Sequence, residues 1–140
     1  MIEFHSQNGF ELLNRPQIIT WLTKLVEDEQ HSLGILSFVF CDDDFLHRMN
    51  VDYLGHDTLT DIITFDYVLG KEIHGEVYIS TERVTDNAKT FQVDFYTELY
   101  RVLAHGVLHL CGYKDKTKEQ AGLMRSKEDL YISQISKPSA

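Results

Sequence analysis

Hydrophobic positions recur at helical spacing in two long segments of the chain. The segment 94–112 is mostly apolar between its ends; it starts with a capping-type Asp94 and closes on Gly112, a residue suited to the left-handed end of a helix. The segment 16–31 starts with Pro16, which suits a first helical turn. Its apolar residues share one helical face: Ile18, Ile19, Leu22, Leu25 and Val26. We therefore predict an amphipathic surface helix in 16–31 and a helix buried nearly all round in 94–112.

Short apolar segments rich in branched and aromatic residues predict strands. Segment 34–41 (GILSFVFC) has the character of a buried strand. Segments 60–68 and 74–81 alternate apolar and polar residues, and we expect them to pair as neighbours through the connection LGKEI. Strands and helices follow one another without a regular repeat. We therefore predict an α+β fold in which one domain, residues 1–140, packs a small mixed sheet with helices.

Three further helices complete the prediction: 44–54, 81–91 and 118–135. The run Asp42 to Asp44 precedes the first of them, and two interpretations of it are open. Three aspartates can form an acidic metal-binding cluster, or they can cap the helix and fill its first turn, where carboxylates are stabilising. We favour the helix cap.

Composition limits the class of protein. The net charge is −9, from 22 acidic and 13 basic residues, which argues against a broadly basic nucleic-acid binder but leaves a local basic patch open. No apolar run approaches the roughly 20 residues needed to span a bilayer, and the N-terminus does not resemble a signal peptide, so we expect a cytoplasmic protein. Cys41 and Cys111 end apolar segments and are expected to be buried, unbridged thiols. Residues 136–140 are expected to form a loose tail.

Two histidines interrupt the apolar helix predicted for 94–112. Between Val102 and Cys111 the only polar side chains are His105 and His109, and a buried polar group without a partner is destabilising. A separation of four residues, at about 100° each, brings the second imidazole over the first, roughly 6 Å away. Each histidine could have its own partner, or both could bind one ion. The paired spacing favours the ion.

The residues that follow the helix supply a third candidate ligand. Gly112 lets the chain turn back, and Asp115 lies three residues further on, which gives the pattern H-x-x-x-H-x-x-G-x-x-D. This spacing parallels the metzincin zinc motif, and two histidines with a carboxylate are an accepted catalytic zinc set that leaves one position open. We therefore expect a zincin-like helix in which His105, His109 and Asp115 bind zinc, with manganese or iron as alternatives.

The residue after the first histidine separates this pattern from zinc proteases. In H-E-x-x-H proteases it is the glutamate that acts as general base, whereas Gly106 has no side chain. A glycine inside a helix is about 1 kcal/mol less favourable than alanine. We therefore expect another backbone or a substrate to approach closely at Gly106, and we rank a metalloprotease last among the functions.

The stretch HGVLHLCGY resembles the signature of the YbeY family, bacterial ribosomal RNA maturation factors that are metal-dependent endoribonucleases. Four blocks of this chain resemble the family, within about residues 34–132: MNVDYLGHDTLTDIITF, GEVYIS, ELYRVLAHG and LMRSKEDLYI. The resemblance implies cleavage of single-stranded RNA in ribosomal RNA maturation and ribosome quality control. It also implies ribosomal RNA and ribosome components as partners, and neither DNA nor a membrane.

Two positions depart from the family pattern. Asp115 stands where the family has a third metal-binding histidine, and Leu54 stands where it has an arginine held to be important for activity. Leucine cannot hold a phosphate or neutralise its charge, so the catalytic residues stay unassigned. The chain offers four cations as substitutes by position, of which Lys114 and Lys116 are the candidate RNA-binding residues: Arg48, Lys114, Lys116 and Lys118. Ordinary solvated charge is the alternative interpretation.

Two functional hypotheses from different classes therefore remain. In the first, the chain is a metal-dependent endoribonuclease whose ion polarises a phosphoryl oxygen. In the second, it is a ribosome-associated maturation factor in which the ion is mainly structural and cleavage is weak or absent. Leu54 and the net charge of −9 favour the second.

Overall fold

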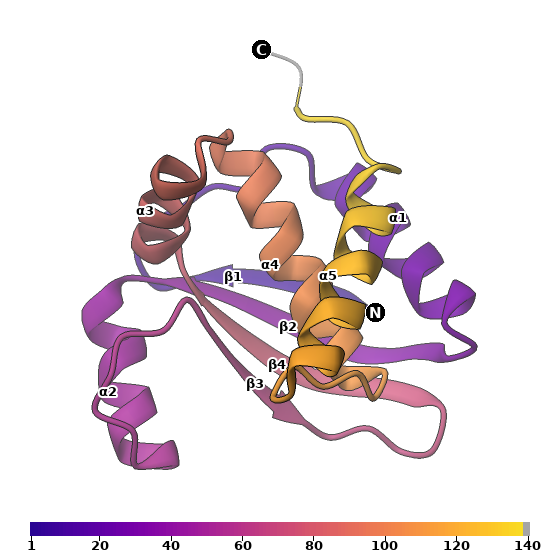
Figure 1. Cartoon of the computed structure of the whole chain (residues 1–140), viewed down its shortest axis with the longest axis horizontal. Helices are drawn as coiled ribbons and strands as arrows, with labels where there is room; N and C mark the ends of the chain where they lie inside the picture. Colours follow the sequence, from indigo (N-terminus) through magenta and orange to yellow (C-terminus); the bar gives the residue numbers. More distant parts are fainter. Residues whose placement is uncertain (139–140) are drawn as a thin grey trace.

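The structure, a computed structural model, describes residues 1–138. Its strands are β1 (Ile2–Ser6), β2 (Ser32–Cys41), β3 (Ile62–Asp66) and β4 (Glu72–Ser80). Its helices are α1 (Arg15–Asp28), α2 (Asp43–Leu54), α3 (Thr81–Phe91), α4 (Phe95–Leu110) and α5 (Lys118–Ile132). The strands form one mixed sheet in the order β1-β2-β4-β3, in which only β3 runs antiparallel to its neighbour (Figure 1). The predicted α+β class and the pairing of β3 with β4 are confirmed.

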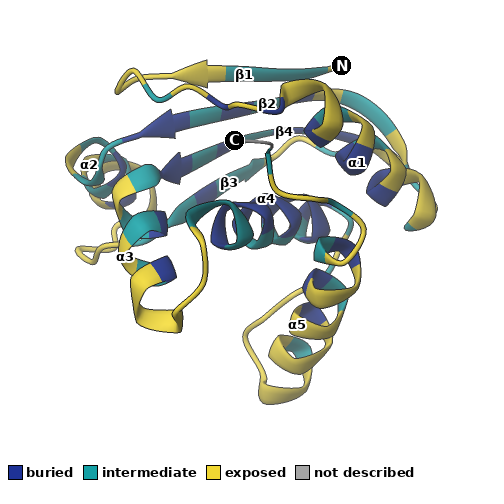
Figure 2. Cartoon of the chain, turned by 90° about the horizontal axis from the view of Figure 1, so that it is seen from above, coloured by how far each residue is buried: buried dark blue, intermediate teal, exposed yellow. Residues whose placement is uncertain are grey.

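The main core lies between one face of the sheet and helices α1, α4 and α5. Side chains alternate between the two faces of a strand, so every second residue of the central strands points into this core: Leu36, Phe38 and Phe40 from β2, and Ile73, Val77 and Ile79 from β4. Helix α4 crosses this face of the sheet, and α5 packs on its outer side (Figure 2). Most of α4 is buried, as its sequence predicted. The two histidines of α4 are therefore held by a rigid, centrally packed helix.

Helix α2 partly covers the opposite face of the sheet. A smaller apolar cluster there joins Leu46 of α2 to Cys41 and Ile63. The Asp42 side chain caps α2 by accepting a hydrogen bond of 2.8 Å from the Phe45 backbone N–H. The interpretation of the aspartate run as a helix cap is thus confirmed.

Strand β1 was missed because five residues with two alternating apolar positions carry a weak pattern. The strand is stabilised by its parallel pairing with β2 rather than by its own sequence. Helix α1 ends at Asp28, earlier than predicted, since Gln30 adopts a left-handed backbone with φ of 63°. Helix α5 likewise ends at Ile132 instead of residue 135.

The explanation for Gly106 was wrong. A Cβ atom at this position would lie 3.1 Å from Ile62 Cδ1 and 3.1 Å from Val77 Cγ1, so the close neighbours are side chains of β3 and β4. Neither a backbone nor a substrate has to approach there. The missing side chain lets α4 pack closely on the sheet.

The chain ends differ from the expectation in part. The Tyr100 hydroxyl donates a 3.0 Å hydrogen bond to the Ser136 carbonyl, and Lys137 pairs with Asp94, which makes no side-chain cap on α4. The predicted tail is therefore attached at its start, and its residues 139–140 lie outside the described residues.

Cys41 and Cys111 are both free, as predicted, although Cys111 is only partly buried. None of the helices in the described residues combines enough length with enough apolar character to cross a membrane.

Candidate metal centre

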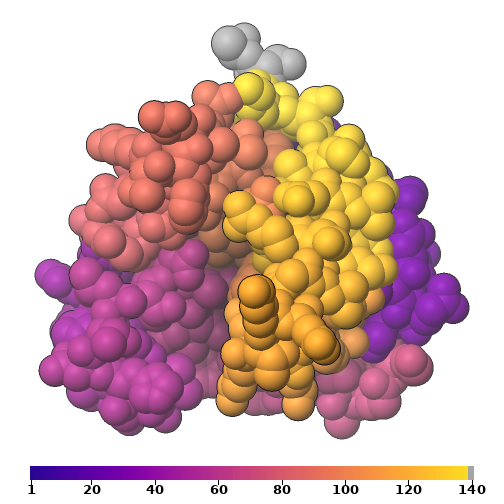
Figure 3. All heavy atoms as spheres, in the orientation of Figure 1, coloured from indigo at the N-terminus to yellow at the C-terminus, as the bar shows by residue number. Residues whose placement is uncertain are grey.

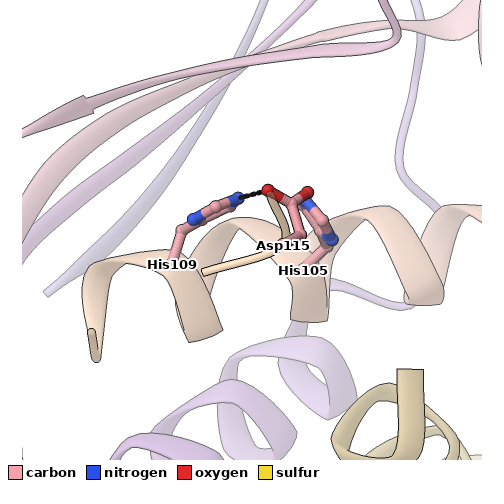
Figure 4. Close-up of side chains that lie close together, drawn as sticks. All are labelled: His105, His109 and Asp115. Atoms are coloured by element: carbon pink, nitrogen blue, oxygen red, sulfur yellow. Dashed lines mark ion pairs between the residues drawn. The ribbon is translucent and has the colours of Figure 1, made fainter. Parts of the chain in front are cut away.

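His105, His109 and Asp115 converge on one point. The histidines lie one turn apart on α4, and their rings are 4.7 Å apart between centroids. Gly112, with φ of 105°, turns the chain back after the helix, so that the Asp115 carboxylate lies beside both imidazoles (Figure 4). Each residue offers one ligand atom, and these atoms all lie within 4.8 Å of one another.

The distances within this group fit a small metal ion. His105 Nε2 lies 3.3 Å from Asp115 Oδ2, and His109 Nε2 lies 3.6 Å from Asp115 Oδ1. Ligand atoms about 2.0–2.1 Å from a tetrahedral ion are about 3.4 Å apart. Two imidazole nitrogens and a carboxylate oxygen also match the ligands that zinc accepts. The three residues can therefore hold one ion with little movement.

Glu128 of α5 fixes the orientation of His105. The His105 Nδ1–H donates a 2.7 Å hydrogen bond to Glu128 Oε2, which leaves Nε2 directed at the convergence point. Arg101 Nη1 donates to the other oxygen of the same carboxylate at 3.0 Å. The Glu128 residue is only 4% exposed. It therefore acts as a buried support for the candidate ligand, and its only sequence signal was its place within the family-like block LMRSKEDLYI.

The two imidazoles have opposite pKa shifts. Burial, followed by the neighbouring charge of His105, lowers the pKa of His109 below its ordinary value. Burial also acts to lower the pKa of His105, but the hydrogen bond and charge of Glu128 outweigh it and raise that pKa. Because a metal ion binds neutral imidazoles, protons compete with the ion at His105 more than at His109.

A second polar cluster holds the loop that carries Asp115. The Tyr113 hydroxyl donates a 2.6 Å hydrogen bond to Glu29 Oε1, while Tyr131 and Lys127 of α5 donate to Glu29 Oε2. The Glu29 side chain is 8% exposed. Burial raises the pKa of this carboxyl, but the hydrogen bonds from the two tyrosines and Lys127 outweigh it and hold the pKa below its ordinary value. The loop between α4 and α5 is thereby tied to the end of α1.

Replacing Glu29 by glutamine is expected to destabilise the protein by about 1–3 kcal/mol near neutral pH, because the donors lose a charged acceptor. A carboxyl whose pKa is lowered by folding stabilises the folded state above its unfolded pKa, about 4.3. That contribution is lost as the pH falls through the folded pKa. Urea unfolding at several pH values should therefore show the two stabilities converging below about pH 4.

The exposed Glu27, on the same helix, provides the matched control. Glu27→Gln should change the stability by less than about 0.5 kcal/mol, as is usual for surface substitutions. A constant gap between wild type and Glu29→Gln at all pH values would show that the charge of Glu29 contributes nothing.

The candidate centre lies in a cleft of about 1040 Å³. Figure 3 shows the surface hollowed between α5 and the segment that contains α2 and the following loop. Both α4 and α5 contribute a row of lining residues, and the edge strand β3 contributes another. Five carboxylates line the cleft: Asp61, Asp66, Glu98, Asp115 and Glu128. Three cations line it as well: Arg101, Lys116 and Arg125.

The structure separates the cations that the sequence suggested. Lys116 lines the cleft, whereas Lys114, Lys118 and Arg48 are not among the lining residues. Leu54 lines the cleft and is 46% exposed, so the position that departs from the family belongs to the same cleft as the candidate centre.

Several cleft residues were not anticipated from the sequence. Arg101 and Arg125 lie on the cleft, as does His56. Asp61 lies there too, and burial raises the pKa of its carboxyl although the charge of His105 opposes this. The only sequence signal for Arg101 and Arg125 was their place within the family-like blocks, because their position depends on how α4 and α5 pack together.

Comparison with known protein families shows to which family the chain is related. A family model described as Endoribonuclease YbeY matches residues 3–136. The chain belongs to the endoribonuclease YbeY family. The match confirms the resemblance seen in the signature, and it extends at both ends beyond residues 34–132. At the level of the family, the expected class of enzyme, an endoribonuclease and thus a hydrolase, is also confirmed.

Curated relatives carry the same family name. "Endoribonuclease YbeY" of Flavobacterium johnsoniae is 54% identical over 133 residues, which cover 95% of this chain and 96% of the relative. That of Christiangramia forsetii is 51% identical over 94% of this chain and 92% of the relative. The solution structure of TM1509 from Thermotoga maritima aligns over 100% of this chain and 99% of its own with a TM-score of 0.66. At 24% identity, that last likeness shows the shared fold alone.

Proposed function

We propose that this YbeY-family chain is a metal-dependent endoribonuclease that cleaves single-stranded segments of ribosomal RNA. We further propose that it acts in the cytoplasm, in ribosomal RNA maturation and ribosome quality control, with ribosome components as partners. The observation that carries the proposal is the convergence of His105, His109 and Asp115 within an open cleft. DNA and membranes are not proposed as partners.

Zinc is the proposed ion, with manganese or iron as alternatives that the carboxylate of Asp115 would accommodate. When bound, such an ion supplies a Lewis acid that polarises a phosphoryl oxygen. The surrounding residues position the candidate ligands. Glu128 fixes the ring of His105, and the hydrogen bond from Tyr113 to Glu29 fixes the loop that carries Asp115.

The cleft has features that favour a single strand. Residues of the edge strand β3 line it, and its volume of about 1040 Å³ lies at the upper end of the range for ligand pockets. Phe91 lines it and is 53% exposed, which makes its ring available for stacking with an unpaired base. Paired bases already stack within a duplex and present no free face to such a ring.

The second candidate function is a maturation factor in which the ion is mainly structural. Leu54 favours it, because this cleft-lining side chain can neither hold a phosphate nor neutralise its charge. A metalloprotease is disfavoured further, since Gly106 packs against Ile62 and Val77 and offers no general base.

The two functions differ in a direct experiment. Metal-stripped protein is reloaded with zinc, manganese or iron and incubated with a ribosomal RNA fragment, either single-stranded or annealed to its complement. The proposed function requires cleavage of the single strand by loaded protein only, and neither the duplex nor DNA of the same sequence should be cut. A rise in melting temperature on loading, without cleavage, would instead favour the structural ion.

A further inference from the structure

One face of α5 is directed into the cleft. Ala121, Met124, Arg125 and Glu128 all line it, and their spacing of three, four and seven residues is that of a single helical face. Met124 and Glu128 are buried against the rest of the protein, whereas Arg125 is exposed. The Arg125 side chain therefore projects from the side of α5 that carries the support for His105, about one turn away.

Arg125 differs from the other arginine of the cleft in its partners. Arg101 is held on both sides, since it donates to Glu128 at 3.0 Å and to Asp129 at 2.7 Å. Among the described residues, Arg125 takes part in no ion pair or side-chain hydrogen bond. Its guanidinium thus keeps all its donors free for a ligand, while that of Arg101 is occupied within the protein.

The charge of the cleft makes such a free cation necessary for an anionic ligand. Five carboxylates line the cleft, and an RNA phosphate entering it would be repelled unless a cation faced it. Arg125 is one of the residues that line this cleft. Burial raises the pKa of Glu98 on α4, and the charges of Arg101 and Arg125 act against that rise.

The structure assigns Arg125 as the phosphate-binding residue of the cleft: its guanidinium donates two parallel hydrogen bonds to one phosphodiester of a single-stranded RNA. This inference rests on the proposed function. A guanidinium matches the two free oxygens of a phosphodiester, which the ammonium of Lys116, another cation of the cleft, does not. Arg125 thereby holds the strand over His105, His109 and Asp115 and neutralises charge that grows on the phosphoryl oxygens.

The test combines cleavage and binding in the metal-loaded protein. Arg125→Ala should lower kcat/KM for a short single-stranded RNA by about 10²-fold, the usual effect of removing one such donor. Binding is measured with a 2′-O-methyl strand that stays intact. The negative slope of log affinity against log salt should become shallower by about 0.7, which corresponds to the loss of one phosphate contact. Arg125→Lys should restore the salt slope but only part of kcat/KM, because it keeps the charge and loses the paired donors.

Two further variants make the test specific. Lys118→Ala removes the same charge from the same helix outside the cleft lining, and it should cleave and bind like wild type. Leu54→Arg, which places a guanidinium elsewhere on the cleft wall, should recover part of the activity that Arg125→Ala loses. Unchanged melting of Arg125→Ala would show that the fold is intact, as expected for an exposed side chain.

The outcomes separate this inference from the proposed function. Wild-type cleavage and binding that persist in Arg125→Ala would overturn the role of Arg125 and leave the endoribonuclease intact. If the wild type binds RNA without cleaving it, the proposed function fails, and the salt slopes still decide whether Arg125 holds a phosphate. Absence of RNA binding by the wild type would overturn both.

Discussion

Replacing His109 by alanine is expected to abolish binding of the ion and to reduce RNA cleavage by more than about 100-fold. Among the described residues, His109 is one of only three ligand-type side chains at the convergence point. Replacing a residue that merely hydrogen-bonds to a metal ligand already lowers metal affinity or activity by about 10- to 100-fold, so loss of a ligand itself should have a larger effect. Zinc affinity is measured by competition with a chromophoric chelator, and cleavage is measured on a single-stranded ribosomal RNA fragment.

The same variant has a thermodynamic signature. Zinc at about 1,000 times its dissociation constant stabilises a protein by about 4 kcal/mol if it binds only the folded state. Stripped wild type should therefore melt at a higher temperature on zinc addition, and His109→Ala should not. His5→Ala, an exposed histidine outside the cleft, should respond like wild type. Equal shifts in His109→Ala and His5→Ala would mean that the ion binds elsewhere.

The candidate centre could be predicted because its parts are local in sequence. Two histidines four residues apart in a helix must lie one turn apart, whatever the rest of the fold. Gly112 can adopt a φ of 105° because it has no side chain. It therefore permits the chain reversal that brings Asp115 back to the helix. The burial of α4 also followed from its own sequence, since apolar residues cover most of its circumference.

The surroundings of the centre could not be predicted in the same way. Glu128 lies 23 positions after His105, and their contact depends on the packing of α5 against α4. The same packing brings Arg125 to the cleft, while Lys114, suggested by its nearness in sequence to Asp115, is not among the lining residues. Sequence distance is a poor guide here, because a loop residue next to a ligand can point away from it.

Gly106 shows a further limit of sequence reasoning. The glycine correctly indicated a close approach, and it correctly removed the general base of a zinc protease. The identity of the neighbour was wrong, because side chains of Ile62 and Val77 occupy the space that an alanine Cβ would need. A missing side chain indicates crowding without naming its source, which depends on how α4 packs on the sheet.

Replacing Glu128 by glutamine is expected to lower zinc affinity by about 10- to 100-fold while leaving the three ligand-type residues in place. Glutamine keeps the size of the side chain, but its amide has one acceptor oxygen where the carboxylate has two. It cannot accept from both His105 Nδ1 at 2.7 Å and Arg101 Nη1 at 3.0 Å, so the ring of His105 loses its fixed orientation or Arg101 loses its partner.

The stability of the metal-free protein should show how much the contacts of Glu128 contribute to the fold. Glu128 is 4% exposed, and removing one partner from a buried charged contact leaves the others unpaired, so Glu128→Ala should destabilise the fold by about 3–5 kcal/mol. Asp129→Asn is the control. It weakens the ion pair between Arg101 and Asp129, whose side chain is 59% exposed, and it should change the stability by less than about 1 kcal/mol.

Undiminished zinc affinity in Glu128→Gln, measured in a variant that still folds, would contradict the prediction for zinc binding. It would show that His105 is oriented by the helix alone and that the carboxylate of Glu128 serves only to hold Arg101.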